Sequence, residues 1–498
     1  MSGVPTTVAV SNPSPSLSCR LENPVALSPL RRRTARPHGV RRPITAVTAA
    51  SLAAGALTLL APGATAAPCD PWPPAGGTAG GSGSLSGSLG APASAPATPW
   101  ADGGNGYIPV LRGRTTTVEL LTGPTSPNDT VDRFGISGTD LGILWDNGDA
   151  SDPQMMMALG DTMGDCDAPG DQWRSNILFR SGDRTLADGM RITDAPMERP
   201  GMAKSILPRT GHPDETTVIP TAGVEVGGTQ YLRYMSVERW GSPGEWTTNY
   251  SALARSTDNG ENWVPVRDTA RRGTAPMPLP VDLGPESTTH TAGQMSAFLK
   301  HDGFVYEYLT PSGRSGSARL ARVPENRIEE MAAYRFWDGG DWVVDHRDAV
   351  PVLGAPTVNS AVSELSVSWS EHLGRFIALY NNRANNIVMA QSATPWGPWS
   401  GEDILLSYQH VPTLYGAFVH PWSPAVETRG EDLYFTMSTW DAYNVFLMRT
   451  DLTQIPPRTL PDARARMRTT DDSWTRNTPD PADTGETVLV ERRSIPEA

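Results

Sequence analysis

The stretch Ser256-Thr-Asp258-Asn-Gly260-Glu-Asn-Trp263 is the most informative local motif for the fold of this chain. It matches the pattern Ser-x-Asp-x-Gly-x-x-Trp, the Asp box, which is a structural motif of β-propeller blades. In such a turn Asp258 accepts hydrogen bonds from backbone N–H groups, Gly260 takes a positive φ, and Trp263 packs beneath the hairpin. We therefore expect Asp258 to be structural and not catalytic.

Five clusters of short strand patterns make up most of the chain around this motif. Each cluster holds several apolar or alternating runs separated by turns, and the clusters recur at intervals of roughly 50 to 70 residues. They span residues 134–192, 217–256, 295–323, 365–391 and 416–449. Repetition of one strand–turn–strand unit is typical of a propeller. The sequence therefore predicts an all-β, five-bladed β-propeller, with a long-looped β-sandwich as the alternative.

Two aspartates lie at the ends of apolar runs in the first cluster. Asp140 follows Gly-Thr in the run 135–145, and Asp161 lies between Gly and Thr in the run 155–164. Small neighbours allow a short carboxylate to sit at a crowded strand end. Two carboxylates presented by adjacent strands suit acid/base hydrolysis of a glycosidic bond. The alternative is that either aspartate serves only to bond backbone groups in a turn.

Further candidate site residues follow other strand patterns. His420 stands at a strand end, where it is able to bond substrate, tune a carboxylate or ligate an ion. Trp240 and Trp440 lie in polar loops and offer flat faces to sugar rings. Asn381 directly follows a strand and is a candidate for binding hydroxyl groups, and Glu364 is a candidate third acid. For each of these the alternative is a purely structural or surface role.

The organisation along the chain predicts an exported protein. Residues 1–67 read as a signal peptide, with an arginine-rich segment, an apolar run and a small-x-small cleavage site. Residues 68–110 are a Gly/Ser/Pro-rich linker. Residues 111–456 form the propeller, and 457–498 are a polar tail that we expect to be flexible. We expect a secreted or cell-wall-associated chain, with no membrane attachment after cleavage.

Net charge and composition limit the classes of molecule that the chain is expected to bind. The formal charge of the whole chain is −13, and residues 1–67 contain seven Arg and one Glu, so the remaining chain carries −13 − (7 − 1) = −19. A strongly acidic protein repels nucleic acid and anionic membranes, and a neutral polysaccharide fits better. No Cys/His spacing resembles a zinc site. We expect no cofactor, no metal and a monomeric chain.

Cysteine usage predicts one disulfide. After removal of residues 1–67, only Cys69 and Cys166 remain. An even number of cysteines in an oxidising compartment favours a bridge between them. Two free thiols are the alternative.

With five strand clusters, Gly-Thr-Asp140 and Gly-Asp161-Thr in the first, and Gly416-Ala-Phe-Val-His420-Pro in the last, the chain resembles a known family. This is the actinobacterial family first catalogued as domain of unknown function 4185, now grouped with endo-D-arabinanases as glycoside hydrolase family 183. The resemblance covers residues 120–451. It implies a five-bladed propeller that cleaves internal α-D-arabinofuranosyl linkages of mycobacterial arabinogalactan and lipoarabinomannan with inversion.

The resemblance also implies the catalytic pair, because the two acidic residues near the start of the family's domain match Asp140 and Asp161. We assign Asp140 as the base and Asp161 as the acid. The main alternative function is a non-catalytic carbohydrate-binding propeller. A sialidase would also carry Asp boxes, but the arginine cluster and the Tyr–Glu nucleophile of that chemistry are not recognisable here.

Overall fold

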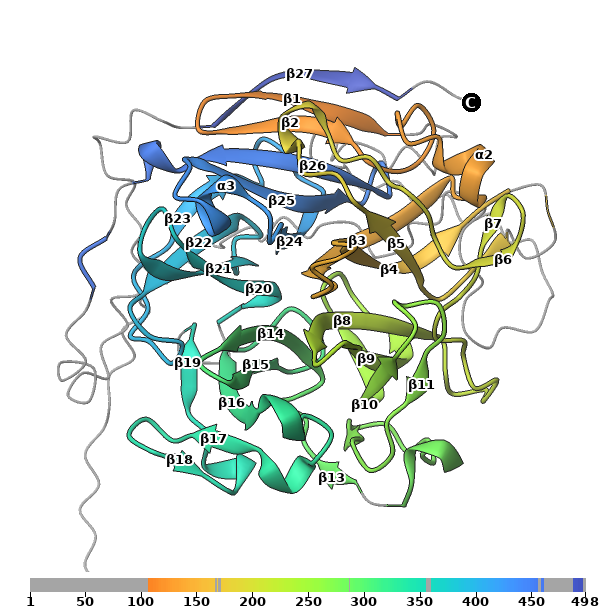
Figure 1. Ribbon diagram of the computed structural model, residues 1–498, viewed down its shortest axis with the longest axis vertical. Helices are drawn as coiled ribbons and strands as arrows, with labels where there is room; N and C mark the ends of the chain where they lie inside the picture. The colour runs from red at the N-terminus through yellow and green to blue at the C-terminus, as the bar shows by residue number, and fades with distance from the viewer. Residues whose placement is uncertain are drawn as a thin grey trace, which may run out of the picture. The chain divides into compact units, whose positions relative to one another are not determined.

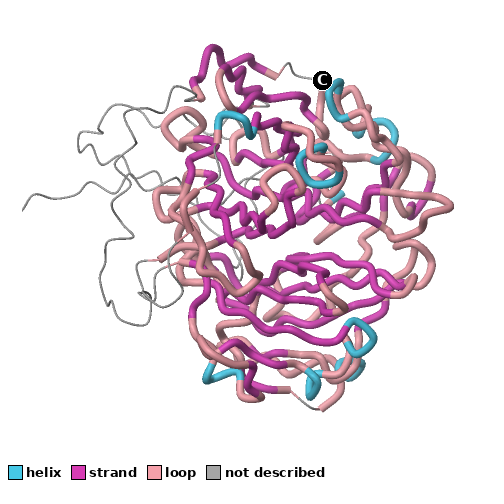
Figure 2. The backbone as a smooth tube through the Cα atoms, turned by 60° about the vertical axis from the view of Figure 1, so that its left-hand side comes forward, coloured by secondary structure: helices cyan, strands magenta, loops and turns pink. Residues whose placement is uncertain are grey.

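The computed structural model describes residues 106–165, 168, 172–285, 287–354, 360–455, 458–460 and 487–495. Strands dominate this part of the chain, and its helices are short (Figure 2). None of the helices described is long and apolar enough to cross a membrane. The predicted Cys69–Cys166 disulfide lies outside the described residues.

In the described part of the chain, five mainly antiparallel sheets stand around a common centre as propeller blades (Figure 1). Their innermost strands are β3 (Gly138–Asp146), β8 (Thr217–Val226), β14 (Met295–His301), β20 (Ser363–Ser370) and β24 (Leu414–Val419). Each innermost strand contacts the next, and β24 contacts β3, so the ring is closed. The prediction of an all-β, five-bladed propeller is confirmed, and the β-sandwich alternative is wrong.

The remaining elements complete the blades. The first blade continues with β4 (Met155–Met163) and β5 (Ile177–Ser181). The second adds β9 (Thr229–Trp240), β10 (Trp246–Ser256), β11 (Val264–Pro265), β12 (Arg271–Arg272) and β13 (Thr288–Thr289). The third adds β15 (Phe304–Thr310), β16 (Ala318–Pro324), β17 (Arg335–Trp337), β18 (Trp342–Val343) and β19 (Pro351–Leu353). The fourth adds β21 (Arg375–Asn381), β22 (Ile387–Ser392) and β23 (Asp403–Leu406).

Short elements fill the connections. They are the hairpin β6 (Met197–Arg199) and β7 (Met202–Ala203), the helices α2 (Thr130–Phe134) and α3 (Pro424–Glu427), and the 3₁₀ turns η2 (Leu186–Asp188), η3 (Val281–Leu283), η4 (Glu325–Arg327), η5 (Met331–Ala333), η6 (His346–Asp348) and η7 (Leu452–Gln454).

The fifth blade joins the two ends of the propeller. It consists of β24, β25 (Asp432–Thr439), β26 (Asn444–Asp451) and β2 (Thr115–Leu120), and β2 pairs antiparallel with β26. Because a strand from before the first blade is hydrogen-bonded into the last, opening the ring requires breaking that ladder. The closure therefore holds the inner strands in register around the centre.

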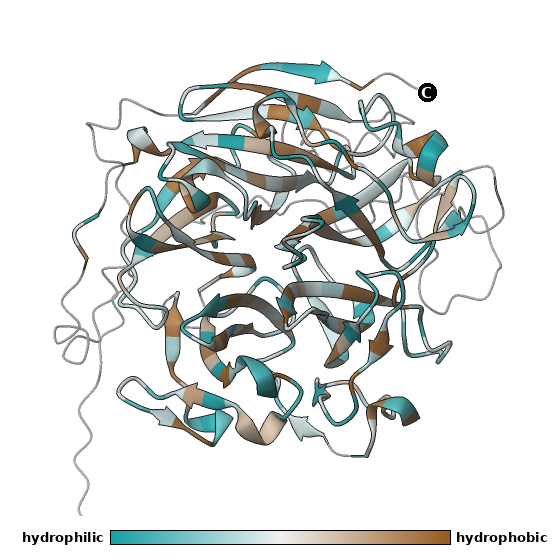
Figure 3. Cartoon of the chain, viewed as in Figure 1, coloured by the Kyte–Doolittle hydropathy of each residue, from teal (hydrophilic) through white to brown (hydrophobic). Residues whose placement is uncertain are grey.

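One outer strand corrects the expected boundaries. β27 (Val488–Ser494) pairs with β1 (Tyr107–Arg112), although 457–498 was predicted to be a flexible polar tail. β27 is exposed along most of its length, with an apolar first part and a hydrophilic second part (Figure 3). Main-chain hydrogen bonds to β1 suffice to order such a strand, and composition does not reveal them.

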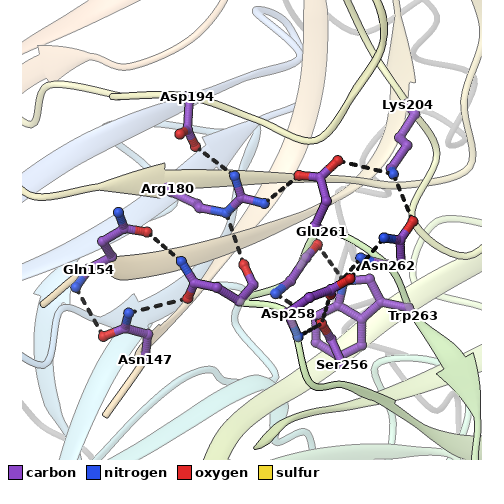
Figure 4. Close-up of polar contacts among 12 residues, drawn as sticks. Asn147, Gln154, Arg180, Asp194, Lys204, Ser256, Asp258, Glu261, Asn262 and Trp263 are labelled. Carbon is purple, nitrogen blue, oxygen red and sulfur yellow. Dashed lines mark hydrogen bonds and ion pairs between the residues drawn. The ribbon is translucent and has the colours of Figure 1, made fainter. Parts of the chain in front are cut away.

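The Asp box adopts the predicted geometry (Figure 4). Asp258 accepts hydrogen bonds from the Ser256 hydroxyl at 2.7 Å and the Asn262 backbone N–H at 2.9 Å. Gly260 has a φ of +78°, and Trp263 is 9% exposed. The Trp263 ring meets the edge of Trp145 from the first blade at 6.5 Å. The motif is therefore structural, as predicted, and packs the second blade against the first.

A polar network reinforces the same contact (Figure 4). Arg180 of β5 donates to Asp194 at 2.9 Å and to Glu261 of the Asp-box turn at 2.8 Å. Lys204 pairs with the other oxygen of Glu261 at 3.2 Å. Because the Arg180 side chain is only 9% exposed, this pair is less screened than the surface ion pairs of the molecule.

We expect Asp258→Ala to lower the free energy of unfolding by about 1 kcal/mol, because the turn loses its charged acceptor at an exposed position. Urea unfolding followed by tryptophan fluorescence measures this change. The near-ultraviolet circular dichroism of the folded protein should match that of the unmodified chain. An unchanged free energy of unfolding would contradict the structural role.

Candidate active site

A central cavity is lined by side chains from all five blades. It encloses about 1040 Å³ of space, part of which is open to solvent. Asp140, Asp161, Glu245 and Glu364 lie in its wall, and Arg314 is the one cationic residue among the described residues that line it. Because its wall carries four carboxyl groups and one guanidinium group, the charge of the cavity does not favour an anionic ligand.

A β-bulge between β3 and β4 brings the two predicted aspartates together. Thr139 pairs with Thr162 and Leu141 pairs with Leu159, so Gly160 and Asp161 together face the single residue Asp140. A Cβ atom at Gly160 would lie 2.3 Å from Asp140 Oδ1, so only glycine fits there. The bulge therefore turns both carboxyl groups toward the cavity from adjacent strands.

Strained backbone surrounds the pair. Leu141, Glu364 and Tyr443 all line the cavity and have φ values of +73°, +44° and +44°. Such conformations cost a residue with a side chain about 1–3 kcal/mol and collect at functional sites. Three of them around one cavity indicate that the fold holds these side chains in place against local preference.

Asp140 is 8% exposed and has one hydrogen-bond donor. The Tyr415 hydroxyl donates to Oδ2 at 3.0 Å, and Oδ1 has no partner among the described residues. Burial raises the pKa of Asp140 well above its usual value, and the negative charges of Asp161 and Glu364 raise it further. The bond from Tyr415 and the positive charge of Arg314 act in the opposite direction.

Asp161 is 7% exposed and better supported as an anion. The Thr217 hydroxyl donates to Oδ1 at 2.5 Å. Burial raises the pKa of Asp161 to about 7, and hydrogen bonds from Thr217 and Trp173 together with the charge of Arg209 limit the rise.

The two aspartates therefore have different preferred states. Because more groups stabilise the Asp161 anion, Asp161 ionises first and Asp140 keeps its proton. Adjacent carboxyl groups titrate as a coupled pair, so each ionisation opposes the next. One buried acid and one buried base side by side are the requirement for general acid/base chemistry.

Aromatic side chains flank the pair on two sides. In the second blade, Trp240 meets Trp246 edge to face at 5.7 Å. In the fifth blade, Trp440 stacks on Tyr415 at 4.4 Å and lies 6.1 Å from Tyr443. The first blade stands between these two blades in the ring, so the acids lie between two partly exposed aromatic surfaces. Trp240, the last residue of β9, and Trp440 both line the cavity.

His420 is a correction to the prediction that it faces the funnel. It is fully buried, its Nδ1 accepts from the Trp422 backbone N–H at 3.2 Å, and burial lowers its pKa to about 3. Tyr415, five residues earlier, reaches the cavity instead. The His420 ring lies 6.0 Å from the ring of Trp422, and neither residue lines the cavity.

Asn381 also does not line the cavity. It is 1% exposed at the end of β21, and its Oδ1 accepts from the Gly416 backbone N–H at 3.1 Å. Gly416 has a φ of +68° in the irregular part of β24 that follows Tyr415. Asn381 therefore supports the backbone beside Tyr415 and does not face a ligand.

Several cavity residues gave little signal in the sequence. Glu364 was a weak candidate because it precedes an apolar run, and the structure places it in the cavity wall. Arg314 lies in a Pro-Ser-Gly-Arg-Ser-Gly stretch that reads as an exposed turn. From the sequence, Tyr415 and Tyr443 could not be distinguished from aromatic residues of the core, because aromatic side chains are common both in cores and in the walls of cavities.

Known proteins resemble this chain to different degrees. Notoamide biosynthesis cluster protein J from Aspergillus sp. (strain MF297-2) is 27% identical over 334 residues, which cover 62% of this chain and 81% of that protein. Its counterpart J' from Aspergillus versicolor is also 27% identical over 334 residues, covering 62% of this chain and 82% of that protein.

Among solved structures, a putative hydrolase from Bacteroides ovatus ATCC 8483 has a TM-score of 0.44 at 14% identity, covering 65% of this chain and 88% of that one. The native Bacillus subtilis arabinanase Arb43A has a TM-score of 0.38 at 12% identity, covering 65% of this chain and 99% of that one. TM-scores and identities this low say nothing about the activity of this chain, which therefore has to be inferred from its own site. Residues 125–449 match the family described as domain of unknown function, DUF4185, and the chain therefore belongs to that family.

Proposed function

We propose that this chain is a glycoside hydrolase that cleaves internal α-D-arabinofuranosyl linkages of mycobacterial-type arabinan. The observation that carries the proposal is the pair of buried carboxyl groups, Asp140 and Asp161, with unequal proton affinity between two aromatic surfaces. Aromatic faces stack on the apolar faces of sugar rings, and the acidic lining suits a neutral glycan. The choice of D-arabinan rests on the resemblance to the endo-D-arabinanases of the same family.

In this mechanism Asp140 is the general acid and Asp161 the general base, the reverse of our assignment from sequence. Asp140 gives its proton to the glycosidic oxygen as the bond to the anomeric carbon breaks. Asp161 takes a proton from a water molecule as that water attacks the anomeric carbon from the opposite face. The configuration is therefore inverted, and the enzyme returns to its first state when Asp140 regains a proton and Asp161 loses one. Tyr415 holds the Asp140 carboxyl group in place.

The chain is proposed to act outside the cell and as a monomer. Export through the N-terminal signal would bring the chain to the cell wall, where its substrate lies, and we propose that it acts there as a monomer. Cofactor-free acid/base hydrolysis needs only the two carboxyl groups and water.

Digestion of purified mycobacterial arabinogalactan tests this function. We expect the polymer to shorten early, with arabinan oligosaccharides of several lengths and little free arabinose, because cleavage of internal linkages shortens a polymer before it releases single sugars. Size-exclusion chromatography with mass spectrometry measures the products, and Asp140→Asn protein is the control. Binding of the polymer without any cleavage would instead identify a carbohydrate-binding propeller.

A further inference from the structure

Arg314 connects the third blade to three others at the cavity. It lies between β15 and β16, and its backbone N–H donates to the Gly244 carbonyl of the second blade at 2.7 Å. Its Nε and Nη2 reach Glu364 Oε1 of the fourth blade at 2.8 Å and 2.7 Å. Its guanidinium lies 5.1 Å from the ring centre of Tyr415 and 5.6 Å from that of Trp440, both in the fifth blade. One side chain therefore touches the partners that surround Asp140.

Glu364 is held as firmly as Arg314. Its side chain is 8% exposed, and its backbone takes a φ of +44° where β20 departs from regular pairing. The Ser363 hydroxyl donates to its second carboxyl oxygen. The cation and the hydroxyl occupy both oxygens of this buried carboxyl group and hold it in one orientation. Glu364 is thus placed to position Arg314 beside Asp140.

We propose that Arg314 and Glu364 are a pair of positioning residues that balance the charge beside Asp140 and hold Tyr415 against its carboxyl group. This inference rests on the proposed function, in which Asp140 is the acid. Arg314 packs over the ring whose hydroxyl donates to Asp140, so its planar guanidinium fixes that donor. Arg314 and Glu364 act on the charge of Asp140 in opposite directions, so the pair adds little net charge beside it.

The groups facing Asp140 determine the expected signs. They are Asp161 from β4, Tyr415 from β24, Tyr443 from the turn before β26, Glu364 from β20 and Arg314 from the β15–β16 connection. Removing the positive charge of Arg314 raises the pKa of Asp140, and removing the negative charge of Glu364 lowers it. Because the acid must be protonated, activity is lost as the pH rises through the pKa of Asp140.

The test compares the pH dependence of kcat/KM for Arg314→Met, Glu364→Gln and the double variant. We expect the alkaline limb to move up by about one pH unit in Arg314→Met and down by about one in Glu364→Gln, the scale of one nearby charge in a partly buried site. The double variant should return close to the original limb. Arg314→Lys keeps the charge but loses the planar group over Tyr415, so its limb should lie between those of the unmodified chain and Arg314→Met. Arg255→Met, which breaks the remote Arg255–Glu329 pair, should change nothing.

A second readout works without substrate. Titration of ¹³C-labelled aspartate carboxyl groups by NMR, with Asp140→Asn protein to identify the resonance, should show the same opposite shifts. Opposite shifts in a chain that cleaves no arabinan would support the pair and overturn the proposed function. Active variants whose Asp140 titration and alkaline limb do not move, or a double variant no closer to the original than either single one, would overturn the pair.

Discussion

Asp140→Asn and Asp161→Asn should each lower the cleavage of D-arabinan by about a hundredfold or more, while the blades stay folded. Each substitution keeps the shape of the side chain and removes the proton or the charge that the reaction needs. Initial rates on purified arabinogalactan measure the loss, and circular dichroism with thermal unfolding checks the fold. Full activity in either variant would remove that residue from the mechanism.

The two variants should differ on an activated substrate. An aryl arabinofuranoside with a good leaving group needs little protonation, so Asp140→Asn protein should recover part of its rate. Asp161→Asn protein should not, because attack by water still requires a base. Recovery in Asp161→Asn instead would restore the assignment of Asp161 as the acid. NMR of the first product should find inverted configuration, and retention would require a nucleophile in place of the base.

Asp161→Asn should also stabilise the protein at alkaline pH. The pKa of Asp161 rises from 3.8 to about 7 on folding, so the folded state favours the protonated form. The cost of ionising the buried group is absent below pH 3.8, grows as the pH rises, and reaches its limit above the folded pKa. At pH 8 that cost is about 4 kcal/mol, because each pH unit between the unfolded and folded pKa values contributes about 1.4 kcal/mol. The asparagine variant avoids it.

Urea unfolding at pH 4, 6 and 8 measures this effect. We expect the gain of Asp161→Asn to be near zero at pH 4 and largest at pH 8. Asp258→Asn is the matched control: burial opposes the charge of Asp258, but hydrogen bonds from Asn262 and Ser256 outweigh burial and lower its pKa. That variant should lose stability at pH 8. A loss of stability at pH 8 in Asp161→Asn would show that the native carboxylate is well solvated or well paired.

Such a gain has a functional meaning. A fold that buries two carboxyl groups is less stable than one with neutral side chains in the same positions. Enzymes tolerate this loss of stability because burial raises the pKa of an acid, which can then donate a proton near neutral pH. The positive φ values of Leu141, Glu364 and Tyr443 around the same cavity are a further cost in stability at this site.

Local sequence patterns were sufficient to predict the five blades and the aspartate pair of the candidate site. The Asp box around Asp258 depends on contacts within eight residues, and the strand clusters depend on runs of a few residues. Asp140 and Asp161 were found because both lie in one hairpin, where the glycine at 160 leaves room for a carboxylate. A site that lies within one turn or one hairpin is formed by residues close together in the sequence, so it can be predicted from the sequence.

The rest of the site was decided by closure of the ring. Tyr415 is 275 residues away from Asp140, and Arg314 and Glu364 are 50 apart, yet all four meet in one cavity. His420 was mistaken for a cavity residue because a strand pattern does not show which residues near the end of a strand are covered by other segments. The sequence by itself determined five blades and an aspartate pair. The tertiary structure alone decided which charges and rings surround that pair, because these neighbours come from the other four blades and only packing around a common centre brings them within reach.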